Sequence, residues 1–219
     1  KRMTFSEENY LKTIYHLTTL LDTEVSTNAI AEMMETKASS VTDMLKKLAE
    51  KHLVNYKKYQ GVSLTEKGKL SAKMIVRKHR LWEVFLVEKL DFSWDEVHDI
   101  AEQLEHIKSE QLINRLDDFL GNPTEDPHGD PIPDANGQII KIEKQLLSEL
   151  SENQTGMCVG VKDTSSEFLK YLDKQGIALG SKIQIVAKET FDLSLKIKVN
   201  GNELTISNKI ASNLFVKMI

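Results

Sequence analysis

Six side chains of the kinds that bind divalent metal ions lie within one short part of this chain. They form two sets, His79 with Glu83, and then His98, Glu102, Glu105 and His106. Imidazole and carboxylate groups bind first-row divalent metals, and a chain with one cysteine cannot build a site from several thiolates. The sequence therefore predicts a metal site with nitrogen and oxygen donors.

The second set lies on a predicted helix. In residues 96–107 apolar side chains recur every three or four positions, which places them on one stripe at about 100° per residue. The four candidate ligands fall in a neighbouring arc roughly 100° wide. His79 and Glu83 are four residues apart in an earlier helical stretch, so they also share a face. Acidic residues on a helix are most often a solvated surface, and a lone histidine most often an ordinary polar group, but two same-face sets favour metal.

Composition places the chain among soluble globular proteins with two or three small domains. It has 219 residues, of which 40% are hydrophobic, and a mean hydropathy of −0.34. No apolar run approaches about 18 residues and the start of the chain has no signal-peptide pattern, so we expect a cytoplasmic protein with no membrane partner. Cys158 is expected to be a small core residue.

Charge is unevenly distributed along the chain. The net charge of −4 by itself argues against a nucleic-acid partner. Residues 1–73, however, contain 12 Lys and Arg against 9 Asp and Glu, a net of +3, whereas residues 74–219 contain 17 against 24, a net of −7. The basic front part indicates an anionic partner for that part of the chain.

Prolines and glycines divide the chain. All four prolines and three glycines fall in 121–137, which neither a helix nor a central strand accommodates. Upstream, the spacing of apolar residues predicts helices at 6–21, 27–35, 39–51, 66–90, 94–107 and 109–120, with a break at 53–65. Downstream, a predicted helix at about 139–152 precedes predicted strands at 181–187, 193–199 and 203–206, with Asn200-Gly201 as a hairpin turn.

The front part has the layout of a winged helix-turn-helix. A helix at 27–35, a polar turn and an amphipathic helix at 40–51 precede two strand-like runs around Gln60-Gly61. Helix pairs of this kind also occur in proteins that bind no DNA, and some lysines could simply be solvated, but the pair, the basic wing and the local charge together favour DNA. The predicted DNA-binding residues are Lys37, Ser39, Ser40, Thr42, Asp43, Lys46, Lys47, Lys57, Lys58 and Tyr59.

These motifs resemble the diphtheria toxin repressor and manganese transport regulator family of metal-dependent bacterial transcriptional repressors. The likeness covers the chain and is strongest in ENYLKTIY at 8–15, SSVTDMLKKL at 39–48, LTEKG at 64–68, RKHRLWE at 77–83, HDIAEQLEH at 98–106 and PHGDPIP at 127–133. The resemblance implies a mainly α protein with a small β domain. Its parts would be a winged helix domain at 1–73, a helical metal-binding and dimerisation domain at 74–152, and an SH3-like β-barrel at 153–219.

The resemblance also implies two metal sites in each subunit. The primary, activating site would use Asn9, Glu102, Glu105 and His106. The ancillary site would use His79, Glu83 and His98, together with Glu167 and, as a weaker candidate, Asp163 from the third domain.

Two positions in the first predicted helix depart from family patterns. Asn9 stands where the family usually has Met or Asp; its amide oxygen is a hard donor that could bind Mn²⁺ or Fe²⁺, or could only form a hydrogen bond near the helix start. Lys12 stands where one short manganese-sensing branch has a glutamate ligand, so the paired-metal geometry of that branch is in doubt.

The expected function is a homodimeric repressor with Mn²⁺ or Fe²⁺ as corepressor. A metal held by Asn9 and by residues 102–106 would tie the DNA-binding domain to the dimerisation domain. Two recognition helices about 34 Å apart could then enter successive major grooves of palindromic double-stranded DNA. Since Cys and Met ligands are absent, Mn²⁺ is favoured over iron. Dimer contacts would come from the apolar faces of 81–90 and 107–120, including Trp82, Phe85 and Phe119, although these faces could instead only fill an internal core.

Two other functions would use similar side chains. A metallohydrolase or a di-iron oxidase also places His and Glu on helices, but the chain has no H-E-x-x-H motif and only one Glu-x-x-Glu-His run, so no enzyme is expected. A metal store or chaperone would not need a wing. A salt-sensitive, metal-dependent gel shift separates the repressor from both.

Overall fold

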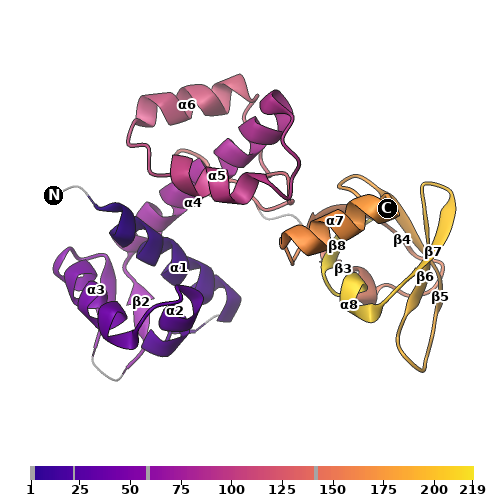
Figure 1. The fold of residues 1–219 in the computed structure, drawn as a ribbon, viewed down its shortest axis with the longest axis horizontal. Coiled ribbons are helices and arrows are strands. Elements are labelled where there is room, and N and C mark those ends of the chain that lie inside the picture. Colours follow the sequence, from indigo (N-terminus) through magenta and orange to yellow (C-terminus); the bar gives the residue numbers. More distant parts are fainter. Residues whose placement is uncertain (1–2, 22, 58–59, 141–142) are drawn as a thin grey trace. The chain divides into compact units, whose positions relative to one another are not determined.

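The structure, a computed structural model, describes residues 3–21, 23–57, 60–140 and 143–219 (Figure 1). It divides into two compact units that alternate along the sequence. One comprises Lys1–Trp82, Glu102–Asp118 and Pro133–Ile139, and the other comprises Glu83–Ala101, Phe119–Ile132 and Ile140–Ile219. Helices α4 (Glu66–Leu90) and α5 (Val97–Leu104) each contribute residues to both units.

The front of the first unit is a winged helix-turn-helix, as the sequence predicts. Helices α1 (Phe5–Leu21), α2 (Thr27–Met33) and α3 (Ala38–Glu50) precede the antiparallel strands β1 (Val54–Tyr56) and β2 (Val62–Leu64). Leu11 and Ile14 of α1 and Leu45 of α3 are fully buried in one core. Because cores are closely packed, this contact holds α1 and α3 in a fixed mutual orientation.

Three further helices follow the wing, namely α4, α5 and α6 (Glu110–Phe119). The predicted helix at 94–107 is shorter than expected, since α5 begins at Val97 and ends at Leu104. Glu105 and His106 therefore lie in the turn after α5, which is closed by a hydrogen bond from the Ile107 amide to the Leu104 carbonyl at 3.1 Å. Neither the 25-residue α4 nor any other helix in the described ranges is long and apolar enough to cross a membrane.

The second unit contains an antiparallel sheet of six strands in the order β3-β8-β4-β5-β6-β7. The elements are β3 (Gln145–Leu146), η1 (Leu147–Glu149), β4 (Thr155–Val161), α7 (Ser166–Gln175), β5 (Lys182–Lys188), β6 (Leu195–Val199), β7 (Asn202–Ile206), α8 (Asn208–Ala211) and β8 (Leu214–Met218). The predicted hairpin is confirmed, with Val199 paired to Asn202. Asn200 and Gly201 have φ values of 49° and 90°, as a type I′ turn requires.

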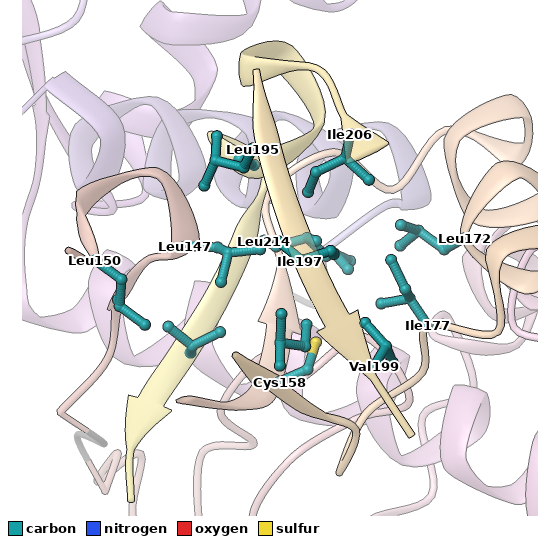
Figure 2. Packing of buried hydrophobic residues seen from close by; sticks show 14 of the residues in the cluster. Leu147, Leu150, Cys158, Leu172, Ile177, Leu195, Ile197, Val199, Ile206 and Leu214 are labelled. Carbon is teal, nitrogen blue, oxygen red and sulfur yellow. The ribbon is translucent and has the colours of Figure 1, made fainter. Parts of the chain in front are cut away.

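One apolar core supports this sheet (Figure 2). Leu195, Ile197 and Val199 alternate along β6 and are all buried, while the lysines between them are exposed. Leu172 from α7 and Leu214 from β8 belong to the same core. The alternation of apolar and polar residues in this part of the sequence therefore reflects a strand that is buried on one face.

The predicted helix at about 139–152 is wrong. Its described part contains β3, which pairs with β8, and the single 3₁₀ turn η1. Leu147 and Leu150 have the three-residue spacing of a helical face, but one short turn brings both into the core of the sheet. Packing against the sheet therefore overrides the local helical pattern.

Candidate metal centres and DNA-binding surface

The first candidate centre joins α1, α4 and the end of α5 within the first unit. The fully buried Glu105 accepts hydrogen bonds at Oε2 from Lys12 Nζ and from His79 Nδ1, both at 2.7 Å. Lys12 also forms an ion pair with Glu102 Oε1. His79, Glu102 and Glu105 offer ligand atoms within 4.8 Å of one another. His79, which was predicted for the ancillary set, therefore lies beside two residues of the primary set.

Glu105 is ionised in spite of its burial. Desolvation alone would raise the pKa of its carboxyl group, but the hydrogen bond from His79 and the charge of Lys12 outweigh it and hold the pKa below its usual range. A buried carboxylate of this kind persists only with cations or donors around it. The centre is consequently built to hold positive charge.

Two buried oxygen atoms of the first unit, one of them in this centre, have no hydrogen-bond partner in the described part of the chain. They are Asn9 Oδ1 and Glu105 Oε1. A buried acceptor left unpaired costs about 1–3 kcal/mol. Asn9 lies on α1 between Glu8 and Lys12, both of which contact the α5 side of the centre. Glu105 Oε1 is thus open to a ligand of this centre, and Asn9 Oδ1 is a second candidate donor on α1.

His106 adds a nitrogen donor from the turn after α5. Its Nδ1 lies 2.7 Å from Glu8 Oε2, and its ring stacks on Phe5 with centroids 4.6 Å apart. Its Nε2 lies 4.0 Å from Glu105 Oε1, the unpaired oxygen. A histidine held by a carboxylate through one nitrogen presents the other in a fixed direction to a metal.

Asn9, Glu102, Glu105 and His106 fit a divalent cation. They supply an amide oxygen, two carboxylates and one imidazole, which is a hard donor set of the kind that Mn²⁺ and Fe²⁺ accept. The two unpaired oxygens come from α1 on one side and from the turn after α5 on the other. A cation held by this set would therefore contact both segments.

A second candidate centre lies within the second unit and contains two residues that the sequence analysis missed. Glu83, Asp126 and His128 are all buried and offer ligand atoms within 4.8 Å of one another. His128 Nδ1 lies 3.8 Å from Glu83 Oε2 and 3.9 Å from Asp126 Oδ1, which is too far for a hydrogen bond. His128 Nε2 lies 2.8 Å from the Trp94 carbonyl oxygen, which can only accept, so Nε2 carries a proton. Metal-binding histidines commonly donate their second ring N–H to a backbone carbonyl in this way.

His128 carries a proton in this centre at neutral pH. Burial opposes the charged form, but the carboxylates of Glu83 and Asp126 and the Trp94 carbonyl together raise the pKa of His128 to about 9. Because a metal ligand must be deprotonated, a proton and a metal ion compete for His128 Nδ1.

His98, which was also predicted for the ancillary site, lies beside Glu83. His98 Nδ1 lies 3.5 Å from Glu83 Oε1, so Glu83 faces His98 with one oxygen and His128 with the other. Glu167 is exposed in the first turn of α7, and Asp163 Oδ1 accepts a hydrogen bond from the Ser165 amide at 2.9 Å. Within the described ranges, neither belongs to a group of close ligand atoms. Asp126 and His128 flank Pro127 in the segment 121–137. The prolines of this segment indicated only a domain boundary in the sequence.

Residues 126–130 also attach the second centre to the sheet. The His128 carbonyl accepts a hydrogen bond from the Val161 amide at 3.0 Å. Gly129 has a φ of +80° and lies so close to β4 that a Cβ would come within 2.0 Å of the Val159 carbonyl oxygen. Only glycine combines this backbone conformation with this close approach. The loop that carries His128 is thus part of the contact with β4.

The predicted DNA-binding residues lie around α3 and the wing. Lys37 stands at the N-cap of α3, and Ser39, Ser40, Asp43, Lys46, Lys47 and Lys57 are exposed. The Thr42 hydroxyl donates to the Ala38 carbonyl at 3.0 Å, and Asp43 pairs with Lys46 at 3.3 Å. Lys58 and Tyr59 lie outside the described residues. The exposed side of α3 is therefore polar and available to a partner.

Three family models match successive parts of the chain. The iron dependent repressor N-terminal DNA binding domain matches residues 2–62, and the iron dependent repressor metal binding and dimerisation domain matches residues 65–134. The FeoA domain matches residues 145–218. The three matches follow the order of the winged helix, the helical segment and the sheet.

Similar proteins include transcriptional regulators from archaea and bacteria. An uncharacterized HTH-type transcriptional regulator of Methanocaldococcus jannaschii is 38% identical over 118 residues, which are 54% of this chain and 94% of that protein. The HTH-type transcriptional regulator MntR of Oceanobacillus iheyensis is 35% identical over 117 residues, which are 52% of this chain and 77% of that protein. A solved structure of a manganese-dependent transcriptional repressor in complex with manganese has 35% identity and a TM-score of 0.86, covering 97% of this chain and 100% of that one.

Proposed function

Because this chain belongs to the diphtheria toxin repressor and manganese transport regulator family of metal-dependent DNA-binding repressors, we propose that Mn²⁺ is its corepressor. Asn9, Glu102, Glu105 and His106 hold the activating ion. The observation that carries this proposal is the pair of buried, unpaired oxygens, Asn9 Oδ1 and Glu105 Oε1. The family is one of transcriptional repressors, which is not an enzyme class.

The donor set supports manganese over iron. Glu102 supplies a carboxylate and Asn9 an amide oxygen. The set therefore contains no sulfur donor of the kind that a softer ion prefers. Affinity at such a site still rises from Mn²⁺ through Fe²⁺ toward Cu²⁺, so the preference would appear as activation rather than as tightness of binding. Iron dependence is the alternative within the same family, and the same residues would serve it.

The residues around the first centre connect its occupancy to DNA binding. A bound divalent cation would supply positive charge shared by α1 and by the turn after α5. Asn9 stands on α1, and α1 is packed against the recognition helix α3 through Leu11, Ile14 and Leu45. Holding α1 against Glu105 and His106 therefore restricts where α3 can lie. When α3 is already held in place, less conformational entropy is lost as the protein binds its operator.

The DNA-binding surface is the exposed side of α3 with the wing. Ser39, Ser40, Thr42 and Asp43 lie in the first turns of α3, the part of a recognition helix that reaches base edges. Lys57 lies beside the wing, where a lysine meets phosphate without reading sequence. The family is dimeric, and two copies of α3 would read a palindrome.

Phe119 and Phe85 provide part of the dimer contact. Phe119 is 65% exposed at the end of α6, and its ring lies 6.4 Å from that of Phe85. Leu90 at the end of α4 is also exposed. Large apolar side chains exposed together commonly mark protein interfaces. Trp82 stays a predicted dimer contact.

The second centre holds a second ion and steadies the third domain. Glu83, Asp126 and His128 are its ligands, with His98 on the other oxygen of Glu83. An ion there would fix the loop whose His128 carbonyl and Gly129 meet β4. The contributions of His79, Glu167 and Asp163 to this site stay predictions.

A metal-dependent gel shift tests the proposed function. A palindromic operator is first obtained by selection from randomised duplexes in the presence of Mn²⁺. The dimer should shift this duplex in the presence of Mn²⁺ and should no longer bind it when EDTA is added. Binding should also weaken strongly as the salt concentration rises. Equal shifts with and without metal would overturn the proposal, and a shift with Fe²⁺ but not with saturating Mn²⁺ would establish the iron alternative.

A further inference from the structure

Lys12 occupies a special position in the first centre. Its ammonium group contacts both Glu102 Oε1 and Glu105 Oε2, and its side chain is only 19% exposed. Glu102 and Glu105 are two of the four proposed ligands of the activating ion, so a lysine from α1 already neutralises the carboxylates that a metal ion needs. The protein therefore supplies its own cation to the centre.

The two oxygens of Glu105 differ sharply in their surroundings. Oε2 accepts from Lys12 and His79, whereas Oε1 has no hydrogen-bond partner and faces His106 Nε2 at 4.0 Å. The lysine thus satisfies one side of Glu105, and Asn9 Oδ1 is unpaired as well. Lys12 therefore neutralises Glu105 at Oε2, whereas Glu105 Oε1 and Asn9 Oδ1 are left without hydrogen-bond partners.

We propose that the Lys12 ammonium is a tethered competitor of the divalent ion, which must displace it from Glu102 and Glu105 before all four ligands are engaged. This inference rests on the proposed function of the first centre. Its consequence is a threshold: the apparent metal affinity is the intrinsic affinity multiplied by the fraction of molecules in which Lys12 has released the carboxylates. Lys12 would thereby set the metal concentration at which the repressor responds.

The same contact has a second consequence in the metal-free protein. Without Lys12, the carboxylates of Glu102 and Glu105 would face each other with less compensating charge, and like charges close together destabilise a fold. Lys12 therefore stabilises the metal-free state and opposes the metal-bound state. A merely structural lysine would stabilise both states alike.

The test is a metal titration of the full-length dimer with Lys12→Gln. Binding of Mn²⁺ is measured by calorimetry without DNA, and thermal unfolding is followed with and without Mn²⁺. The variant should bind Mn²⁺ about tenfold or more tightly than the wild type. Its metal-free form should melt at a lower temperature, and Mn²⁺ should raise that temperature by more than it does in the wild type.

Two further variants separate the possible outcomes. Lys51→Gln is the matched control, because Lys51, at the end of α3, pairs at 2.6 Å with Glu7 of α1, which is not one of the four proposed ligands; it should leave the affinity for Mn²⁺ unchanged. Glu105→Gln removes a proposed ligand and should weaken Mn²⁺ binding in the wild-type and in the Lys12→Gln background.

Each result decides a different claim. If Lys12→Gln binds Mn²⁺ no more tightly than the wild type while Glu105→Gln weakens binding, Lys12 is no competitor and this inference is overturned, although the site stands. If Glu105→Gln leaves Mn²⁺ binding intact in both backgrounds, the proposed site itself is wrong, and the inference fails with it.

Discussion

The two candidate centres contain similar side chains but surround them differently. In the first, Lys12 and His79 both lie 2.7 Å from Glu105 Oε2, so the carboxylate is closely neutralised by the protein. In the second, the imidazole of His128 lies 3.8 Å from Glu83 Oε2 and 3.9 Å from Asp126 Oδ1. At the first centre a metal ion would compete with the ammonium group of Lys12, and at the second it would compete with the proton on His128.

The centres also join different parts of the chain. The first connects α1, which packs on the recognition helix, to the turn after α5. The second connects α4 to the loop that meets β4. Donor chemistry alone would give both centres the same role. Their positions are the reason why we propose that the first controls DNA binding and that the second attaches the third domain.

The largest effect should follow from removing His106. We expect His106→Ala to fold and dimerise normally but to lose metal-stimulated operator binding, by about 100-fold or more at saturating Mn²⁺, because one of four ligands is gone. Gel shifts measure the loss, and circular dichroism with sedimentation confirms fold and dimer. Normal metal-dependent repression by this variant would assign activation to another site.

Much of the fold could be predicted because its signals are local. The buried face of α3 and the alternation in β6 appear directly in the spacing of apolar residues. The helix predicted at 139–152 failed because Leu147 and Leu150 are positioned by the sheet, through contacts far away in sequence.

The candidate sites were only partly predictable for the same reason. Glu102, Glu105 and His106 stand together in the sequence, so their cluster is visible there. His128 meets Glu83 only through folding of the proline-rich segment. Nor does spacing reveal that Lys12 reaches across 90 positions to Glu102.

The second largest effect should be a pH dependence of the metal-free protein that comes from His128. Its pKa is raised to about 9 in the fold from 6.5, so its stabilising contribution is complete below about pH 6.5 and is lost as the pH rises through 9. The free energy of unfolding should fall by about 2–3 kcal/mol more between pH 7 and 9.5 in the wild type than in His128→Gln. Denaturant titrations at both pH values measure this, and equal slopes in the two proteins would show that His128 is not charged.

A smaller effect is expected from exchanging one ligand of the first centre for sulfur. Glu102→Cys should weaken activation by Mn²⁺ relative to Fe²⁺ by about tenfold, since a thiolate favours the softer ion. Anaerobic titrations of operator binding with each metal give the ratio. The matched change His98→Cys, on the second centre, should leave that ratio unaltered; a shift of equal size there would erase the distinction between the centres.

The smallest effect concerns DNA contacts that depend on neither centre. Lys57→Gln should weaken binding to every sequence by a similar few-fold factor and lower the salt slope by about one, as expected for one lost phosphate contact. Changing Thr42 should instead alter which operator is preferred. Binding measured at several salt concentrations distinguishes the two, and an unchanged site preference after randomised selection with the Thr42 variant would count against this placement of α3.

The most direct test of the account counts bound Mn²⁺ and measures operator anisotropy in the same titration. The wild type, His106→Ala and His128→Ala are compared, each as the full-length dimer. We expect each variant to lose one ion per subunit, with operator binding abolished in His106→Ala and retained within about tenfold in His128→Ala. Retained operator binding in His106→Ala together with its loss in His128→Ala would contradict the account, because the second centre would then be the activating one.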